Sequence, residues 1–301
     1  MYRSALQIMQ DHILHPTSET PINQECIYIC LIPKSTMPSQ NDLAQTLKAL
    51  HIPGEPIILT NVWDAITART IAQLPETKAL ATASYAVAQA AGVEDQELDL
   101  ETNLRAIRAI AKVAKEFGKP LTADFQDGFG ERLEEGIREV IRAGVVGINL
   151  EDFGREVGEK GELYSVEVAQ DRIRRAMKIA EEEGVPDFVI NARTDALVVG
   201  HDIQEAIKRG KAYLEAGASN VFIWGGRERG GTTGKEVEEA SQALGGRLNV
   251  SMVRIMPGGL GLQDLKEIGV ARISVGPQLM MKTQGFIAEE AKKILDGTPA
   301  F

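Results

Sequence analysis

Short apolar runs alternate with amphipathic stretches along the chain from Ile57 onward. The runs have strand length and many β-branched residues, whereas the stretches between them repeat apolar residues at helical spacing. The strand-like runs are 57–60, 79–83, 120–124, 147–151, 188–193, 220–224, 248–252 and 272–276, and the helical stretches include 100–117, 133–143, 166–183, 203–216 and 235–244. A strand–helix unit repeated eight times in about 240 residues predicts an α/β protein with the (β/α)8 TIM-barrel fold.

Glycines stand where several of the predicted helices end, as in Ala143-Gly144 and Ala216-Gly217. A left-handed glycine is a common way to end a helix before the next strand. An open, doubly wound sheet is the alternative arrangement. Its dinucleotide-binding form has a glycine-rich loop after the first strand, and this chain has Thr60-Asn-Val-Trp-Asp64 there instead, which favours the barrel.

The first forty residues lack this periodicity and contain four prolines and both cysteines, Cys26 and Cys30. We therefore predict an N-terminal extension over 1–40 and a single barrel domain over 41–301. At the boundary, Ser39 or Asn41 is suited to cap a helix that carries Leu43 and Leu47 on its apolar face.

Composition narrows the possible partners. The chain has 33 basic and 43 acidic residues, a net charge of −10, which argues against a nucleic-acid backbone as ligand. Two cysteines four positions apart form no disulfide framework, which suits a reducing compartment. No apolar run is long enough to span a bilayer or to serve as a leader. We expect a cytoplasmic protein that binds a small molecule and neither nucleic acid nor membranes.

Polar residues follow three consecutive predicted strands. Asp124 ends the third strand, Glu151 ends the fourth, and Arg193 lies on the fifth. In a barrel these ends meet at the mouth, and carboxylates brought together there need a compensating cation or proton. Oxygen ligands without histidine or cysteine favour Mg²⁺ or Mn²⁺. The alternative is a set of ion pairs that cap the strand ends, with Arg193 paired to Glu151 or Asp195.

Six segments together resemble the isocitrate lyase / phosphoenolpyruvate mutase superfamily over about residues 55–296. They are Asn61-Val-Trp-Asp-Ala65, Ala81-Thr-Ala-Ser-Tyr-Ala-Val-Ala88, Gly92-Val-Glu-Asp95, Thr122-Ala-Asp-Phe-Gln-Asp-Gly-Phe-Gly130, Gly147-Ile-Asn-Leu-Glu-Asp152 and Ile190-Asn-Ala-Arg-Thr-Asp-Ala196. The resemblance implies a TIM barrel whose C-terminal helix is often exchanged between subunits. A homodimer or homotetramer is therefore expected.

The resemblance also implies a site. It places the metal ion, Mg²⁺ or Mn²⁺, among Asp95, Asp124, Gln126 and Glu151. Gln126 stands where the family has an acid, and one charge fewer should weaken metal binding until an anionic substrate completes the site. Substrate contacts are expected from Ser84, Tyr85, Asp124, Asn191 and Arg193, and catalytic roles from Asp64, Glu151 and Arg193. Asp64 is equally suited to cap the helix that begins at Ala65.

Two family loops are missing from the segment after the fourth strand. Lyases of isocitrate and methylisocitrate have a Cys and a His there, and residues 153–164 contain neither. The phosphomutase branch has a Lys where this chain has Phe153. Arg155, Lys160 or Tyr164 could close over a substrate, although a solvated loop is the favoured interpretation for each.

Reactions that need little from a lid acid are therefore favoured. We expect a Mg²⁺-dependent carbon–carbon lyase or decarboxylase that acts on a small 2-oxo or 2-hydroxy dicarboxylic acid, oxaloacetate-like or alkylmalate-like, through a metal-stabilised enolate. Two alternatives stay open. One is phosphorus–carbon bond chemistry of the phosphoenolpyruvate mutase or phosphonopyruvate type, and the other is a non-catalytic barrel that binds small acids.

Overall fold

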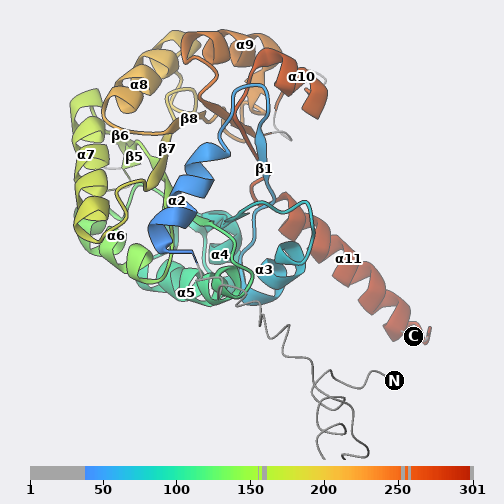
Figure 1. Ribbon diagram of the computed structural model, residues 1–301. Helices are drawn as coiled ribbons and strands as arrows, with labels where there is room; N and C mark the ends of the chain where they lie inside the picture. The colour runs from blue at the N-terminus through green and yellow to red at the C-terminus, as the bar shows by residue number, and fades with distance from the viewer. Residues whose placement is uncertain (1–37, 155, 158–160, 252–254, 257–258, 299–301) are drawn as a thin grey trace, which may run out of the picture. The chain divides into compact units, whose positions relative to one another are not determined.

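A parallel eight-stranded barrel inside a ring of helices forms the domain, as predicted (Figure 1). The computed structural model describes residues 38–298, apart from 155, 158–160, 252–254 and 257–258. The barrel strands are β1 (Ile57–Leu59), β2 (Leu80–Ala81), β3 (Leu121–Asp124), β4 (Gly147–Glu151), β7 (Val189–Thr194), β8 (Asn220–Ile223), β10 (Leu248–Ser251) and β12 (Arg272–Ser274). Each lies within one of the eight predicted runs, extended by one residue in β7.

The barrel closes between its first two strands through a single bridge. The hydrogen-bonded order is β1-β12-β10-β8-β7-β4-β3-β2. Val62, just after β1, forms a parallel bridge with Thr82, just after β2. Its N–H donates to Ala81 O at 2.8 Å, and its carbonyl accepts from Ala83 N at 3.2 Å. Residues on opposite sides of this junction therefore belong to one continuous mouth.

The predicted helices are confirmed to within two residues at each end. The surrounding helices are α3 (Ala65–Ala72), α4 (Ser84–Ala91), α5 (Leu100–Glu116), α6 (Leu133–Arg142), α7 (Val166–Glu182), α8 (Ile203–Glu215), α9 (Gly234–Ala243), α10 (Leu262–Ile268) and α11 (Gln278–Leu295). Local signals set their ends: Asp99 accepts from Thr102 N at 2.7 Å to start α5, and Gly269, at φ 88°, ends α10.

Helix α2 (Gln40–Ala49) precedes the barrel and packs at its N-terminal end. Ser39 is its N-cap, one of the two predicted caps, and accepts from Asp42 N at 3.1 Å. Gln40 Nε2 donates to carbonyls of Ile141 and Val145, which lie just before β4. Residues 1–37 lie outside the described part of the chain, so the predicted extension over 1–40 stays a prediction, but α2 belongs to the barrel domain.

The inside of the barrel is polar next to its mouth. Asn191 Nδ2 donates to Asn149 Oδ1 at 2.6 Å, Asn149 Nδ2 donates to Asp124 Oδ1 at 3.2 Å, and Asn220 Nδ2 donates to Asn191 Oδ1 at 3.0 Å. TIM barrels usually fill this space with bulky branched side chains. Here the large apolar side chains lie outside the barrel, between strands and helices, as Ile148 and Ile190 do.

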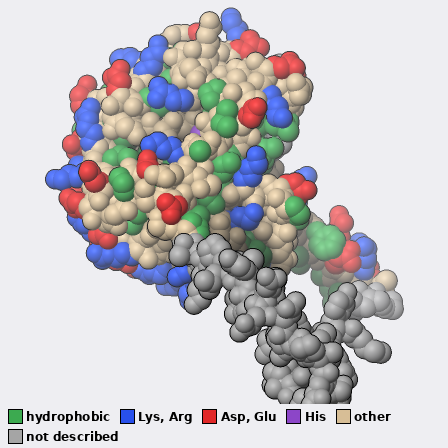
Figure 2. Space-filling model, viewed as in Figure 1, with side chains coloured by type: hydrophobic (Ala, Val, Ile, Leu, Met, Phe, Trp, Pro, Cys, Tyr) green, Lys and Arg blue, Asp and Glu red, His purple; other side chains and the backbone are tan. Residues whose placement is uncertain are grey.

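Two short pairs of strands lie above the barrel: β5 (Phe153–Gly154) with β6 (Glu162–Leu163), antiparallel, and β9 (Thr232–Thr233) with β11 (Ile255–Met256), parallel. On the face shown in Figure 2, acidic and basic side chains are intermixed rather than gathered by sign. None of the helices in the described part of the chain has the length and apolar character needed to cross a membrane.

Candidate active site

A cavity of about 220 Å³ opens at the C-terminal ends of the barrel strands. Its wall includes most of the predicted site: Ser84, Tyr85, Asp95, Asp124 and Arg193. The structure adds residues that the sequence did not single out for the site, namely Asn149, Phe222, Ser251, Arg272, Ser274 and Met281. One cavity therefore joins the mouth to the interior of the barrel.

Asp124 is held rigidly at the end of β3. Its Oδ2 accepts from the backbone N–H of Ser84 at 2.9 Å, and its Oδ1 accepts from Asn149. Its own N–H donates to Thr82 Oγ1 at 2.8 Å. Ser84 was predicted to offer its N–H to a substrate carboxylate, and the structure gives that N–H to Asp124 instead. Tyr85, the next residue of α4, lines the cavity.

Gln126 and Asp95 contact each other from two different loops. Gln126 Nε2 donates both to Asp95 O and to Asp95 Oδ1, at 3.0 Å each. Gln126 is a buried residue in a left-handed conformation (φ 50°), which is uncommon for a side chain of this size. Its Oε1 is buried and has no hydrogen-bond partner among the described residues. A buried oxygen without a donor is a suitable ligand for a cation.

Arg193 forms ion pairs with two carboxylates. Its Nη1 donates to Glu151 Oε1 at 2.7 Å, and its Nε and Nη2 bind Asp195 in a fork at 2.6 and 2.8 Å. The guanidinium also lies 5.3 Å from the ring centre of Trp224. The ion pairs of Arg193 that were the alternative to a metal site are therefore present, and they use all three nitrogens of the guanidinium.

Acidic groups outnumber basic ones around Glu151. Burial raises the pKa of Glu151 well above its usual range, Arg193 opposes this, and Asp195, Asp124 and Asp95 raise it further. Burial likewise raises the pKa of Asp195 against the effect of Arg193. Four carboxylates share one close guanidinium, so a bound cation would relieve the repulsion.

The donor set suits Mg²⁺ better than zinc. The described residues contain no group of three His, Cys, Asp or Glu side chains that could hold a metal ion among themselves. Mg²⁺ usually keeps several waters and takes only one or two carboxylates together with substrate oxygens. Asp95, Asp124, Glu151 and the unpartnered oxygen of Gln126 fit that pattern. Such a site would be completed by water and by an anionic ligand.

Four predicted site residues lie outside the cavity wall: Asp64, Gln126, Glu151 and Asn191. Gln126 and Glu151 are bonded to Asp95 and Arg193, which line the cavity. Asp64 caps α3, accepting from Thr67 N at 2.7 Å in a capping box, so the cap alternative is confirmed and the catalytic role stays a prediction. Asn191 is fully buried, and both ends of its amide bind the neighbouring asparagines. In this arrangement the side chain is bonded within the interior amide chain and does not line the cavity, and its substrate contact stays a prediction.

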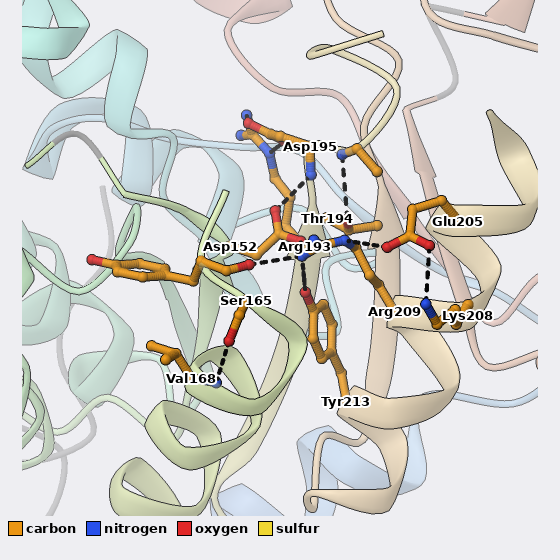
Figure 3. A network of polar contacts seen from close by, with 12 residues as sticks. Asp152, Ser165, Val168, Arg193, Thr194, Asp195, Glu205, Lys208, Arg209 and Tyr213 are labelled. Atoms are coloured by element: carbon orange, nitrogen blue, oxygen red, sulfur yellow. Dashed lines mark hydrogen bonds and ion pairs between the residues drawn. The ribbon is translucent and has the colours of Figure 1, made fainter. Parts of the chain in front are cut away.

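A second polar cluster is centred on Asp152, which does not line the cavity (Figure 3). Asp152 Oδ2 accepts from Tyr213 Oη at 2.6 Å and from Arg209 Nη1 at 3.2 Å, and its Oδ1 accepts from Asp195 N at 2.8 Å. Arg209 also donates to Tyr164 O at 3.0 Å. The network ties α8 to β4, β7 and the end of the 153–164 loop.

The predicted lid is only partly described. Arg155 and Lys160 lie outside the described residues. Tyr164 does not line the cavity, since its Oη donates to Asp127 Oδ2 at 2.9 Å and its ring lies under Arg172. Burial and Asp127 raise the pKa of Tyr164. In this arrangement Tyr164 braces the 127–130 turn.

Asn149 and Arg272 are the main residues that sequence reasoning missed. Asn149 lies two positions before Glu151, so strand alternation alone places both side chains on the inside of the barrel. Arg272 begins an apolar strand, and it is only 3% exposed. A charged residue within an apolar run was the available signal for it.

Comparison of the sequence with known proteins identifies the family of this chain. The sequence model of the phosphoenolpyruvate phosphomutase family matches residues 47–295, and the chain belongs to this family, within the isocitrate lyase / phosphoenolpyruvate mutase superfamily. The 2,3-dimethylmalate lyase of Eubacterium barkeri is 34% identical over 198 residues, which is 63% of each chain. The alignment thus spans less than two thirds of that enzyme.

Solved structures match over more of the chain. A Burkholderia cenocepacia protein with a provisional lyase/mutase name has 32% identity and a TM-score of 0.74, covering 86% of this chain and 90% of its own. Phosphonopyruvate hydrolase, solved with oxalate and Mg²⁺, has 25% identity and a TM-score of 0.73, covering 85% and 88%. That relative binds a small dicarboxylate together with a divalent metal ion.

Proposed function

We propose that this protein is a Mg²⁺-dependent carbon–carbon lyase or decarboxylase that acts on a small 2-oxo or 2-hydroxy dicarboxylic acid. The observation that carries the proposal is the excess of carboxylates at one cavity of molecular size: Asp95 and Asp124 line it, and Glu151 is bonded to Arg193 of its wall. The named relatives support it: they include 2,3-dimethylmalate lyase and oxaloacetate decarboxylase.

Asp95, Asp124, Glu151 and Gln126 would hold the metal ion. When bound, Mg²⁺ (or Mn²⁺) would supply Lewis-acid stabilisation of negative charge on the oxygens of a 2-oxo acid. Asp124 needs no rearrangement for this role, because Ser84 N and Asn149 already fix its two oxygens. This preorganisation is the main contribution a protein makes to such chemistry.

Arg193 would orient the substrate from the opposite wall. Glu151 and Asp195 hold the guanidinium in place, and Phe222 and Trp224 flank it. A cation at the carboxylates would compete with Arg193 for Glu151 and free part of the guanidinium for a substrate carboxylate. Tyr85, in the first turn of α4, would add a backbone N–H, because the first N–H groups of a helix have no partner within it.

The test is turnover of a panel of acids: oxaloacetate, 2-methylmalate-type and 2,3-dialkylmalate-type diacids, each with Mg²⁺ and with EDTA. We expect metal-dependent release of a 2-oxo acid or carbon dioxide from at least one of them. No metal-dependent turnover of any diacid would refute the proposal. Binding of oxalate without turnover would instead indicate the non-catalytic, acid-binding barrel.

Phosphorus–carbon chemistry is the second candidate, supported by the family match and by the phosphonopyruvate hydrolase of Variovorax, 35% identical over 150 residues. Incubation with phosphonopyruvate, followed by ³¹P NMR, separates the two. Appearance of inorganic phosphate or phosphoenolpyruvate would favour this candidate over the carbon–carbon lyase.

We also propose a homodimer or homotetramer. Helix α11 has one buried residue, Met280, while Phe286 and Leu295 are 63% and 85% exposed. Large apolar side chains at this exposure favour coverage by a partner. Light scattering coupled to size exclusion should give two or four copies, and a single copy at micromolar concentration would refute the proposal.

A further inference from the structure

Arg272 is a buried cation inside the barrel, and two of its nitrogens have no hydrogen-bond partner among the described residues. It is the first residue of β12, where the strand register sets it beside Ile57 of β1 and Asn249 of β10. It is 3% exposed and lines the cavity. Its Nε and Nη1 are buried and form no hydrogen bond with any described residue. Arg193, by contrast, forms ion pairs with two carboxylates, those of Glu151 and Asp195.

An unpaired guanidinium in the interior is unfavourable, because a charge loses its hydration on burial and gains no compensating contact. Burial lowers the pKa of Arg272 to about 10, with Asp124 opposing the shift, so the group is still a cation at neutral pH. A residue kept charged and unpaired in a cavity wall is suited to receive an anion.

Further donors without acceptors lie in the same region. Asn249 Nδ2, on the neighbouring strand, is buried and has no partner among the described residues, and neither does the hydroxyl of Thr122, which lines the cavity. One acceptor, Asn220 Oδ1, is also unpartnered, so ordered water is the competing occupant. Water satisfies hydrogen bonds but does not neutralise Arg272, whereas a carboxylate does both.

The cavity has room for a ligand that reaches this depth. Several residues of its wall are small, namely Ala81, Ala123, Ser251 and Ser274. The volume of about 220 Å³ exceeds the roughly 150 Å³ that accommodates a benzene ring in an engineered cavity.

We propose that Arg272 forms an anion subsite within the barrel that binds the second carboxylate of a dicarboxylic substrate, while the 2-oxo acid end occupies the mouth between Asp124 and Arg193. The proposal rests on the proposed function for the placement of that first end. It makes Arg272 a specificity-determining residue that distinguishes diacids from monoacids.

Calorimetry in the presence of Mg²⁺ tests this with ligands matched in length. The pairs are 2-oxoglutarate with 2-oxopentanoate and 2-oxoadipate with 2-oxohexanoate, and oxalate reports on the mouth alone. We expect one diacid to bind about 10- to 100-fold more tightly than its monoacid, the range for charge-assisted hydrogen bonds. In Arg272→Met this preference should vanish while oxalate affinity stays within about threefold.

Thermal unfolding without ligand distinguishes a binding role from a structural one. Arg272→Met removes an unpaired buried charge, so its melting temperature should equal or exceed that of the wild type. Arg272→Lys keeps the charge but loses the planar fork, and should retain only part of the diacid preference. The control, Arg247→Met, removes the same charge from an exposed position before β10 and should leave the preference unchanged.

A wild type that binds oxalate but shows no diacid preference would overturn the subsite and leave the proposed function standing. So would a preference that survives in Arg272→Met, or a loss of oxalate binding in that variant. If Arg272 controls diacid binding but no acid is turned over, the subsite stands and the proposed lyase activity fails.

Discussion

Glu151 and Asp152 are adjacent in the chain, and both lie near an arginine, yet their surroundings differ. Asp152 points outward from β4 and accepts three hydrogen bonds, from Tyr213, Arg209 and Asp195 N (Figure 3). Glu151 points inward and shares one arginine with Asp195 next to two further carboxylates. The satisfied cluster has no cavity of ligand size, whereas the cluster with surplus charge lines one.

The difference indicates how to tell a structural acid from a functional one in this barrel. A buried carboxylate whose lone pairs are filled by protein donors stabilises the fold and has no capacity for a ligand. A buried carboxylate that lacks compensation is costly, and persists where a ligand supplies the missing charge. Four experiments can break or sharpen this contrast.

The largest stability effect is expected from Asp152→Asn. It leaves Arg209 with Glu205 as its remaining carboxylate partner, so the free energy of unfolding should fall by about 1.5 to 3 kcal/mol, the range for a hydrogen bond to a charged group. Urea unfolding measures this. Turnover by the folded variant should fall less than about tenfold, because Asp152 does not line the cavity. An unchanged unfolding midpoint would contradict the structural role.

Glu151→Gln should show the opposite pattern. Metal-dependent kcat/KM should fall by about 100-fold or more, the usual cost of losing a group that stabilises charge in the transition state. The unfolding free energy should change little, because the variant removes a repelled carboxylate. Steady-state kinetics and urea unfolding on the same preparation test both halves. A loss of stability without loss of activity would reverse the assignment of the two clusters.

His51 tests whether an unpartnered buried atom is enough to mark a ligand site. Its Nε2 is buried without a partner among the described residues, and burial, aided by Arg272, lowers the pKa of His51 to about 4. The unfolded state therefore binds the proton first, so stability present above pH 6.5 is lost as the pH falls towards 4. Allowing for partial exposure, the loss should be about 2 kcal/mol.

The control for this pH effect is His51→Gln. In this variant the difference in unfolding free energy between pH 7 and pH 4 should be smaller by about 2 kcal/mol. Unfolding curves at several pH values measure it. An identical pH profile in the variant would show that His51 does not titrate in this window. Since His51 does not line the cavity, neither form should alter ligand binding.

Gln126→Glu should have the smallest effect of the four variants. It should raise the affinity for Mg²⁺ and lower the stability of the metal-free protein. The new carboxylate adds a charged ligand, so Mg²⁺ affinity without substrate should rise about tenfold. It also places a second acid against Asp95, so stability without Mg²⁺ should fall. Mg²⁺ titration by calorimetry, with melting temperatures in Mg²⁺ and in EDTA, tests both. Unchanged Mg²⁺ affinity would exclude Gln126 from the metal site.

A site residue could be predicted where its position depends on neighbouring residues in the chain, and not where it depends on contacts with distant strands. Asp124 was predictable as a cavity residue, and Glu151 as a neighbour of the cavity wall, because they end consecutive strands whose direction the pattern sets. Asp64 could not be assigned from the sequence, since a helix cap and a mouth residue require the same position after a strand. The sequence indicated a substrate contact for Asn191 and none for Arg272, whereas Arg272 lines the cavity and Asn191 does not. The reason is that side-chain partners inside a barrel come from strands distant in the chain.

The sequence by itself determined the class of fold, the ends of most helices and the set of acidic residues at the mouth. These depend on hydrophobic period, caps and chain order, all of which are local. Tertiary structure alone decided which acid is satisfied, which arginine is paired, and how far the cavity extends into the barrel. Those outcomes depend on contacts across strands and on the volume that the neighbouring side chains leave, and one chain's local pattern contains neither.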